Sequence, residues 1–370
     1  MIIGCTKEIK KHEYRVGLTP SNVMDYVHNG HTVLIQAGAG DGSSFSDGEY
    51  VGSGAKIIPD ASEIWQKADM IVKVKEPLEE EYPKMRKGQI IYTYLHLAAD
   101  RPLTEAMLQR EVKGVAYETI TDDKGGLPLL APMSEVAGRL SILEGAKYLQ
   151  RRFGGRGVLL SGVPGTKKAK VVIIGGGVVG LNAAKMAIGL GADVTILDTN
   201  IDRLRYIDDI FGATIQTLTS TPYNIKKEII NADVVIGAVL IHGAAAPKLV
   251  TKFDLQTMLP GSVIVDVAVD QGGCFETTRA TYHDNPIFVE DGVVHYCVAN
   301  MPGSTPRTST IALTNTTISR GLAIANLGLE EAAKRDHHIL PGINTYLGKA
   351  TCKPVADEFG IEYVPIVSLI

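Results

Sequence analysis

The sequence predicts an α/β protein with two doubly wound parallel-sheet domains joined by long helices. Its 370 residues suit about two domains, each large enough to bury a core. Short apolar runs alternate with helix-sized stretches through most of the chain, which is the pattern of parallel sheets covered by helices. Two longer helical stretches, at about 133–153 and 305–335, interrupt this alternation and are expected to connect the domains.

The first alternating region contains a series of predicted strands. A helix is expected to start at Thr19-Pro20, because threonine caps helices and proline suits the first helical turn. Gly30 is expected to end this helix, because glycine favours the position after a helix C-terminus. The predicted strands of this region are residues 1–6, 31–36, 70–74, 89–95 and 114–119.

The segment 170–198 contains the most informative motif. An apolar run stops at Gly175, and Gly177 and Gly180 complete the pattern G-x-G-x-x-G before a helical stretch, a second apolar run and Asp198. Gly175 permits a tight turn, Gly177 lets a pyrophosphate approach the backbone, and Gly180 lets helix and strand pack closely. Free N–H groups at the helix start favour phosphates. Asp198 is placed to bind the adenosine ribose and to repel a 2′-phosphate, so the motif predicts a Rossmann-like domain that binds NAD rather than NADP.

The nucleotide-binding domain is predicted to be an insertion at 130–304 within a substrate domain formed by 1–129 and 305–370. The second long helical stretch, 305–335, is expected to be broken at its threonines. The tail, 346–370, is too short for a domain and is expected to pack on the first domain. The later strands of the inserted domain are predicted at 234–239, 262–267 and 293–298.

Composition and charge exclude several classes of protein. A net charge of −4 gives no basic field for nucleic acid or an anionic membrane. The amino terminus is charged too early for a signal peptide, and no uninterrupted run of ~20 apolar residues predicts a membrane helix. We therefore expect a cytoplasmic protein. The four cysteines are expected to be buried free thiols in a reducing compartment, namely Cys5, Cys274, Cys297 and Cys352.

Four polar residues follow predicted strands, where ligands of open parallel sheets bind. Arg15 lies in the loop after the first strand, Lys75 follows MIVKV, and His96 follows QIIYTYL. Two cations and an imidazole suit a small carboxylate substrate, because arginine binds carboxylates bidentately, lysine polarises a carbonyl or imine, and histidine transfers protons. Asp270 follows SVIVDV in the second domain and is expected to orient His96 or to activate a water.

Structural interpretations remain open for the same residues. Arg15 could be a solvated surface charge, Lys75 could form a simple ion pair with Glu76, and Asp270 could close a turn before two glycines. The adjacent pair His337-His338 suggests a metal site, but no ligand partners at useful spacing accompany it, so no metal is predicted.

The chain resembles bacterial L-alanine dehydrogenases along essentially its whole length. The stretches that match are KEIKKHEYRVGLTP, VKVKEP, YLHLA, MSEVAGRLS, IIGGGVVGLNAAKMAIGLGADVTILD, VDVAVDQGGCFETTR and NMPGSTPRTST. The resemblance implies a cytoplasmic homohexamer that interconverts L-alanine with pyruvate and ammonium using NAD. It also implies that Arg15 and Lys75 bind substrate and that His96 and Asp270 act in catalysis.

The resemblance further assigns a set of residues to the coenzyme, in addition to the motif glycines and Asp198. These are Ser134, Val178, Arg203, Ser220, Val239, Leu240, Val267, Ala268, Val269, Asp270, Arg279, Val298, Ala299, Asn300 and Met301.

The expected chemistry follows from these roles. A neutral substrate amine would lose hydride from its α-carbon, water would add, and ammonia would leave. His96 would move protons and Asp270 would help to activate the water, while Lys75 and Arg15 would stabilise negative charge. Domain closure would exclude water during hydride transfer. Two alternatives share the overall layout: the soluble NAD-binding component of a proton-translocating transhydrogenase, and a saccharopine-type dehydrogenase that acts on a larger substrate.

Overall fold

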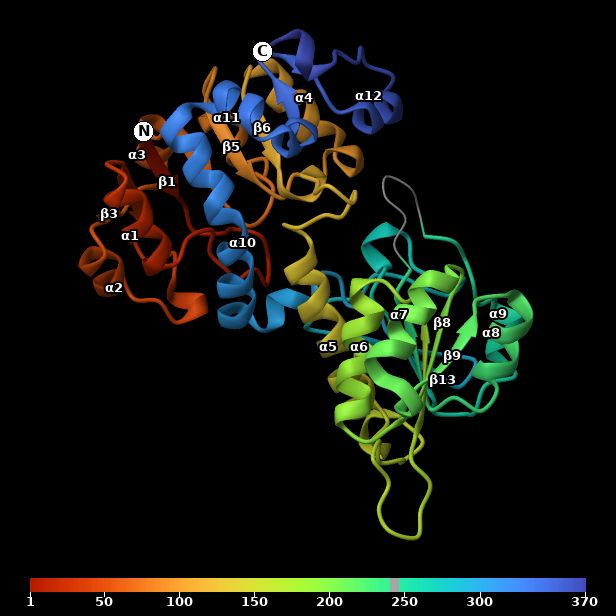
Figure 1. Cartoon of the computed structure of the whole chain (residues 1–370). Coiled ribbons are helices and arrows are strands. Elements are labelled where there is room, and N and C mark those ends of the chain that lie inside the picture. The colour runs from red at the N-terminus through yellow and green to blue at the C-terminus, as the bar shows by residue number, and fades with distance from the viewer. Residues whose placement is uncertain (240–245) are drawn as a thin grey trace. The chain divides into compact units, whose positions relative to one another are not determined.

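The computed structural model describes residues 1–239 and 246–370. The chain divides into two compact units, each of them α/β (Figure 1). Unit 1 comprises Met1–Met133 and Thr305–Ile370, and unit 2 comprises Ser134–Ser304. The first boundary lies within helix α5 (Ala131–Tyr148), and the second lies just before helix α10 (Pro306–Leu327).

Unit 1 is built on an eight-stranded sheet within the described residues, in the order β15-β14-β6-β5-β4-β1-β2-β3. Strands β1 to β6 are parallel, and the order reverses between β1 and β4, as in doubly wound sheets. Antiparallel β14 and β15 extend the sheet beyond β6. The strands are β1 (Ile2–Cys5), β2 (Thr32–Gln36), β3 (Lys56–Ile58), β4 (Met70–Val72), β5 (Ile90–Thr93), β6 (Lys113–Ala116), β14 (Ile343–Tyr346) and β15 (Lys349–Ala350).

The first helix of unit 1 starts and ends where the sequence predicts. The Thr19 hydroxyl accepts the Asn22 N–H, and the Asn22 side chain accepts the Thr19 N–H in return. Gly30 follows the helix with a φ of +82°, a conformation that glycine adopts without strain. The helices of this unit are α1 (Pro20–His28), α2 (Asp47–Gly52), α3 (Ala61–Lys67), α4 (Arg101–Gln109), α10, α11 (Leu329–Arg335) and α12 (Lys353–Phe359).

The second long helical stretch is broken, but the prediction that its threonines break it is wrong. Helix α10 continues through them, and the hydroxyls of Thr314, Thr316 and Thr317 donate to carbonyls three residues earlier within the helix. The break falls at Gly328, which has a φ of +82° between α10 and α11. The tail, 346–370, packs on unit 1 as expected: β15 pairs with β14, and Val355 of α12 lies in the same apolar core as Leu97 and Leu103.

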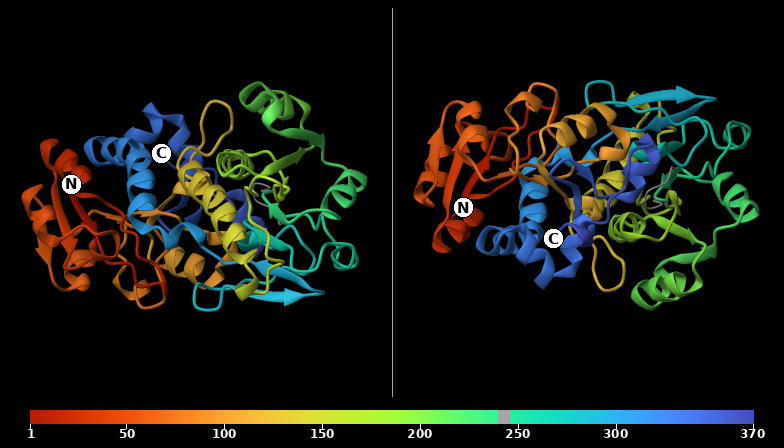
Figure 2. Two further views of the ribbon diagram at one scale, coloured as in Figure 1. Left: turned by 90° about the horizontal axis from the view of Figure 1, so that it is seen from below. Right: turned by 90° about the horizontal axis from the view of Figure 1, so that it is seen from above.

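Unit 2 repeats the same topology in a seven-stranded sheet of the described residues, ordered β12-β13-β11-β10-β7-β8-β9. The strands are parallel except β12, which pairs antiparallel with β13 at one edge (Figure 2). The order reverses between β7 and β10. The strands are β7 (Lys170–Ile174), β8 (Asp193–Asp198), β9 (Gln216–Thr219), β10 (Val234–Gly237), β11 (Val263–Asp266), β12 (Ile287–Glu290) and β13 (Val293–Tyr296).

The sheet of unit 2 is buried on both faces. Val171 and Ile173 of β7 belong to one apolar core and Val172 and Ile174 to another, because successive side chains of a strand point to opposite faces. Helices α5, α6 (Val178–Gly189) and α7 (Ile201–Phe211) contribute to the first core, and α8 (Pro222–Ile229) and α9 (Lys252–Leu255) contribute to the second. The continuous apolar runs in the sequence therefore predict these strands correctly.

The sequence also predicts that no helix crosses a membrane and that the cysteines are buried free thiols. None of the helices in residues 1–239 and 246–370 is long and apolar enough to cross a membrane. Cys5, Cys274 and Cys297 are buried free thiols, as expected, and burial raises the pKa of each to about 12. Cys352 is also a free thiol but is only partly buried.

Candidate active site

The candidate substrate residues of unit 1 lie in loops that follow three adjacent strands. Arg15 follows β1, Lys75 follows β4 and His96 follows β5, so all three loops leave the same edge of the sheet. Glu76, in the loop after β4, contacts the other two loops. Its carboxylate pairs with Lys10 in the loop after β1 and approaches His96 in the loop after β5. Arg15 and Lys75 follow the two strands between which the sheet order reverses, the position where ligands of doubly wound sheets bind.

Arg15 is buried rather than solvated, since only 2% of its surface is exposed. Its Nε and Nη2 donate to the two carboxylate oxygens of Glu13, at 2.7 and 2.6 Å, and Nη1 lies 3.0 Å from the sulfur of Met133. Burial alone would lower the pKa of the guanidinium, but the Glu13 carboxylate outweighs it and raises that pKa. Arg15 is therefore a charged group held rigidly in place by its neighbour.

Lys75 is partly buried at the end of a loop whose backbone is held by a buried carboxylate. The Glu8 Oε1 accepts the backbone N–H groups of Val74 and Lys75, at 2.6 and 3.3 Å. Glu8 is in turn paired with Lys73, whose Nζ lies 3.1 Å from both Glu8 and Glu81. The Lys73 side chain is fully buried between these two carboxylates. This buried ion cluster fixes the position from which the Lys75 side chain extends.

Removing the cation of the Glu8–Lys73–Glu81 cluster is expected to destabilise the fold. Lys73→Met leaves two buried carboxylates facing each other without a shared cation, and breaking a buried pair costs about 3–5 kcal/mol. Chemical unfolding followed by fluorescence measures the loss. The matched control is Lys67→Met, which removes the exposed pair with Glu63 and should change stability little. Equal effects of the two variants would contradict the role given to Lys73.

His96 has a left-handed backbone, with a φ of +49°, that Glu118 stabilises. The Glu118 Oε1 accepts the backbone N–H groups of Leu95 and His96, at 3.1 and 2.7 Å. The imidazole is 46% exposed, and its Nδ1 lies 3.6 Å from Glu76 Oε2. His96 is thus a solvent-accessible imidazole on a constrained backbone, beside a carboxylate.

The Glu76 carboxylate stays ionised beside His96. Burial would raise its pKa, but contact with His96 and the charges of Lys75 and Lys10 outweigh burial and hold that pKa well below its usual range. Glu76 pairs directly with Lys10 and its Oε2 lies 3.6 Å from His96 Nδ1, so its surroundings are more than the simple ion pair with Lys75 that the sequence left open. Glu76 thus places a negative charge beside the His96 imidazole.

The glycine motif of unit 2 forms a tight turn between β7 and α6. Gly175 has a φ of +105°, and a Cβ there would lie 2.7 Å from the Ala238 carbonyl oxygen. A Cβ on Gly180 would lie 1.8 Å from the Gly175 oxygen, so only glycine permits this close packing. A Cβ on Gly177 would meet open space, and no side chain caps α6 at this residue. The turn therefore leaves the start of α6 accessible to a phosphate group.

Asp198 lies at the carboxyl end of β8 and contacts the glycine turn. Its Oδ2 accepts the Gly176 N–H at 2.6 Å, and its Oδ1 accepts the Asn200 N–H at 2.8 Å. Arg203, in the first turn of α7, donates to the carbonyl oxygens of Gly176 and Gly177. A partly exposed acid beside the turn suits ribose hydroxyls, as the sequence predicts.

Most other residues assigned to the coenzyme by resemblance follow the carboxyl ends of strands in unit 2. They are Val178 at the start of α6, Ser220 after β9, Val239 after β10, Val267, Ala268 and Val269 after β11, and Val298, Ala299, Asn300 and Met301 after β13. Ser134 is partly buried on α5, and Arg279 is exposed with its guanidinium 4.0 Å from the centre of the Phe288 ring. Leu240 lies outside the described residues.

Asp270 is exposed on a short 3-10 turn, Val269–Gln271, after β11. Asp266, at the end of that strand, is fully buried and stabilises the turn. Its carboxylate accepts the N–H groups of Ala268 and Cys274, at 3.1 and 2.8 Å, and the hydroxyl of Thr278. Asp270 thus projects from a turn that closes around a buried acid.

Sequence analysis missed a set of acids that position the candidate site. Glu8, Glu118 and Asp266 each accept backbone N–H groups of a loop that carries a candidate residue. A partial signal existed for Asp266, because it is an acid at the end of an apolar strand. Glu13 is two residues from Arg15 and could have been paired with it. Glu8 and Glu118 gave no signal, because their acceptor contacts span 66 and 22 residues of sequence.

Comparison with known proteins identifies the family. Residues 4–137 match the family model described as Alanine dehydrogenase/PNT, N-terminal domain, and residues 141–353 match Alanine dehydrogenase/PNT, C-terminal domain. The chain belongs to the alanine dehydrogenase/PNT family. It is 52% identical to the alanine dehydrogenase of Halomonas elongata over 370 residues, which cover 100% of both chains. It is 53% identical to alanine dehydrogenase 2 of Staphylococcus aureus over 364 residues, or 98% of each chain.

Solved structures agree with this family assignment. An L-alanine dehydrogenase structure with 50% sequence identity matches with a TM-score of 0.94 and covers 97% of this chain and 99% of its own. A transhydrogenase from Sinorhizobium meliloti matches with a TM-score of 0.82 over 95% of this chain and 99% of its own. Its identity is 24%, so this second likeness concerns the fold alone.

Proposed function

We propose that this alanine dehydrogenase/PNT family member catalyses the NAD-dependent oxidative deamination of L-alanine to pyruvate and ammonium, and the reverse reductive amination. The main support is full-length similarity, at 52–53% identity, to proteins named alanine dehydrogenase. The arrangement of charged groups at one edge of the unit 1 sheet suits a small amino acid, because it offers cations for a carboxylate and an imidazole for protons.

The turn after β7 fits a dinucleotide. Gly177 leaves space at the start of α6, where backbone N–H groups would hold the pyrophosphate. Asp198 would accept hydrogen bonds from the adenosine ribose. When bound, NAD would supply the hydride acceptor for the substrate α-carbon. The other residues at the carboxyl ends of the unit 2 strands would line the coenzyme.

The chain's own residues would bind the substrate and move protons. Lys75 would bind the substrate carboxylate and stabilise the oxygen that becomes the pyruvate carbonyl. Arg15 would add positive charge beside the carboxylate. In the structure its Nε and Nη2 are paired with Glu13 and its Nη1 contacts Met133, so we propose that Arg15 acts through its positive charge rather than through a bidentate grip.

His96 would take a proton from the substrate amine and return it to the departing ammonia. Its exposed imidazole can exchange protons with solvent, and Glu76 would stabilise the imidazolium that forms. Asp270 would accept a proton from the water that replaces the amino group. Both residues are proposed as proton carriers in one reaction.

Two alternatives are less well supported. A transhydrogenase component shares the fold, but the similarity to the transhydrogenase structure is 24% identity, against 50% to the alanine dehydrogenase structure. A saccharopine-type enzyme would need room for a larger substrate. Reduction of NAD by the pure protein, measured with L-alanine, D-alanine, glycine, L-glutamate and saccharopine, tests all three. We expect L-alanine to give the highest kcat/KM, and preferential use of saccharopine would overturn the proposal.

Asp198 is expected to determine the choice of coenzyme. Asp198→Ala should narrow the gap in kcat/KM between NADH and NADPH, because a carboxylate close to a 2′-phosphate is unfavourable. Arg203 would then become the nearest charged group and would favour the phosphate. Asp198→Asn removes the charge but nearly keeps the side-chain shape; its single amide oxygen can accept the N–H of Gly176 or of Asn200 but not both, so its stability is measured alongside. If the unmodified protein used NADPH as well as NADH, Asp198 would not have this role.

We also propose that the protein is a cytoplasmic homohexamer, as the family resemblance implies. Light scattering on the purified protein would measure the mass directly, and a mass of one chain of 39.7 kDa would contradict the hexamer.

A further inference from the structure

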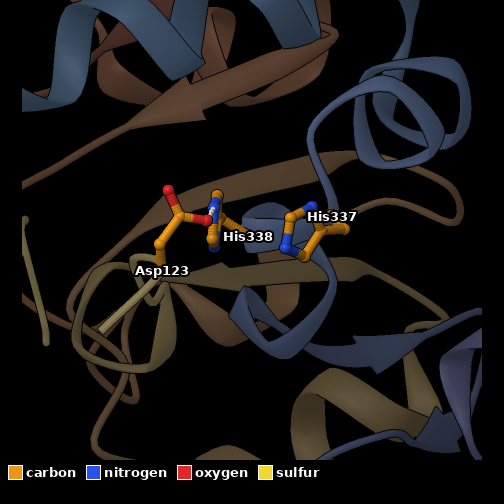
Figure 3. Close-up of side chains that lie close together, drawn as sticks. All are labelled: Asp123, His337 and His338. Carbon is orange, nitrogen blue, oxygen red and sulfur yellow. Dashed lines mark hydrogen bonds and ion pairs between the residues drawn. The ribbon is translucent and has the colours of Figure 1, made fainter. Parts of the chain in front are cut away.

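Asp123, His337 and His338 form a cluster of possible metal ligands outside the candidate active site (Figure 3). One ligand atom from each residue lies within 4.8 Å of the others. The His338 Nε2 lies 3.1 Å from Asp123 Oδ1, and the two imidazole centres are 4.0 Å apart. More than two hundred residues of sequence separate the aspartate from the histidines. The fold thus supplies the partner that the sequence around His337-His338 lacks.

The backbone on both sides of the cluster is held by hydrogen bonds. Asp336 caps the 3-10 helix His337–Gly342 by accepting the His338 N–H at 3.1 Å, and it also pairs with Arg320. On the opposite side, the Asp122 carboxylate accepts the N–H groups of Lys124 and Gly126. The cluster therefore lies between two hydrogen-bonded turns.

The surroundings of the cluster favour a cation. The His338 side chain is 16% exposed, whereas Asp123 is 88% exposed, so an ion would have one sheltered ligand and an open side for water. The carboxylates of Asp122 and Asp123 are adjacent in this turn, and the Asp123 carboxylate lies beside the His338 imidazole.

We propose that Asp123, His337 and His338 bind one divalent transition-metal ion of the Zn²⁺, Co²⁺ or Ni²⁺ type, with water completing its coordination. Two imidazoles and one carboxylate match the ligands of these ions, whereas Mg²⁺ and Ca²⁺ prefer oxygen ligands. The ion would cross-link the 122–126 turn to the 3-10 helix that precedes β14. Because it would bind only the folded unit, it would raise the thermal stability of the protein.

Isothermal titration of the full-length protein with Zn²⁺ and with Ni²⁺ tests the proposal. We expect one strong site per chain, and we expect Mg²⁺ not to compete for it. His338→Ala should weaken binding by more than about tenfold, since even loss of an outer-shell partner has effects of that size. Asp123→Asn keeps the side-chain shape and should also weaken binding. His28→Ala removes another exposed histidine of unit 1 and should leave binding unchanged.

Thermal unfolding with and without Zn²⁺ gives a second measurement that does not depend on activity. The zinc-dependent rise in Tm should occur in the unmodified protein and in His28→Ala, and it should be lost in His338→Ala and Asp123→Asn. Equal zinc binding by all four proteins would overturn the proposal. Loss of binding in His96→Ala, with the Asp123 cluster intact, would assign the ion to the candidate active site and would also overturn it.

Discussion

Replacing His96 with alanine is expected to reduce turnover by about 10²–10⁴-fold, the range for loss of a general acid–base group. His96 is a partly exposed imidazole of the candidate active site, and the ionised Glu76 carboxylate lies beside it. Asp270→Asn keeps the side-chain shape and removes the charge. This variant should impair turnover much more than it weakens coenzyme binding.

The double variant tests whether His96 and Asp270 act in one process. If they do, the double variant should be little worse than the poorer single variant, because residues that act as a unit show non-additive losses. Steady-state constants and NADH affinity of the three proteins provide the measurement. Fully additive losses would show that the two residues act independently. Turnover close to that of the unmodified protein in either single variant would remove that residue from the mechanism.

Replacing Lys75 with alanine is expected to abolish most activity in both directions while NADH affinity remains nearly unchanged. Lys75 belongs to unit 1, whereas the glycine turn and Asp198 belong to unit 2. Its side chain extends from a loop fixed by Glu8, so truncating it should leave the fold intact. Loss of NADH binding by a folded Lys75→Ala protein would contradict this assignment.

Arg15→Lys should also impair turnover, and the structure shows that it should disturb the fold around Glu13 as well. An ammonium cannot reproduce the two parallel hydrogen bonds from Arg15 to Glu13, so the buried Glu13 carboxylate would lose part of its pairing. Unfolding measurements separate this structural effect from a loss of substrate binding. Arg15→Lys should lower both stability and activity, whereas Lys75→Ala should lower activity alone.

Sequence patterns predict the structural elements that are determined by residues close together in the chain. The glycine turn after β7 follows from three glycines at fixed spacing: Gly175 has the turn conformation and Gly180 the close packing that their positions predict, while a Cβ on Gly177 would meet open space. Thr19 and Pro20 predict the start of α1, because capping depends on neighbouring residues. Continuous apolar runs predict the central parallel strands, because those strands are buried on both faces. Antiparallel β12, β14 and β15 lack this pattern and were not predicted.

Features that depend on distant contacts could not be predicted. His96 has a left-handed backbone because Glu118, on another segment, accepts its N–H. The partner of His337-His338 lies in a turn that only the tertiary structure brings close. In each case, the two polar groups that contact each other are far apart in the sequence, so the sequence does not predict the contact.

The most direct test of the proposed activity is the oxidation of NADH by the purified protein in the presence of pyruvate and ammonium. We expect NADH oxidation to require both compounds and to yield L-alanine in a one-to-one ratio with the NADH consumed, as chiral chromatography would measure. NADH oxidation that proceeds without ammonium, or that yields no L-alanine, would contradict the proposal that this protein is an alanine dehydrogenase.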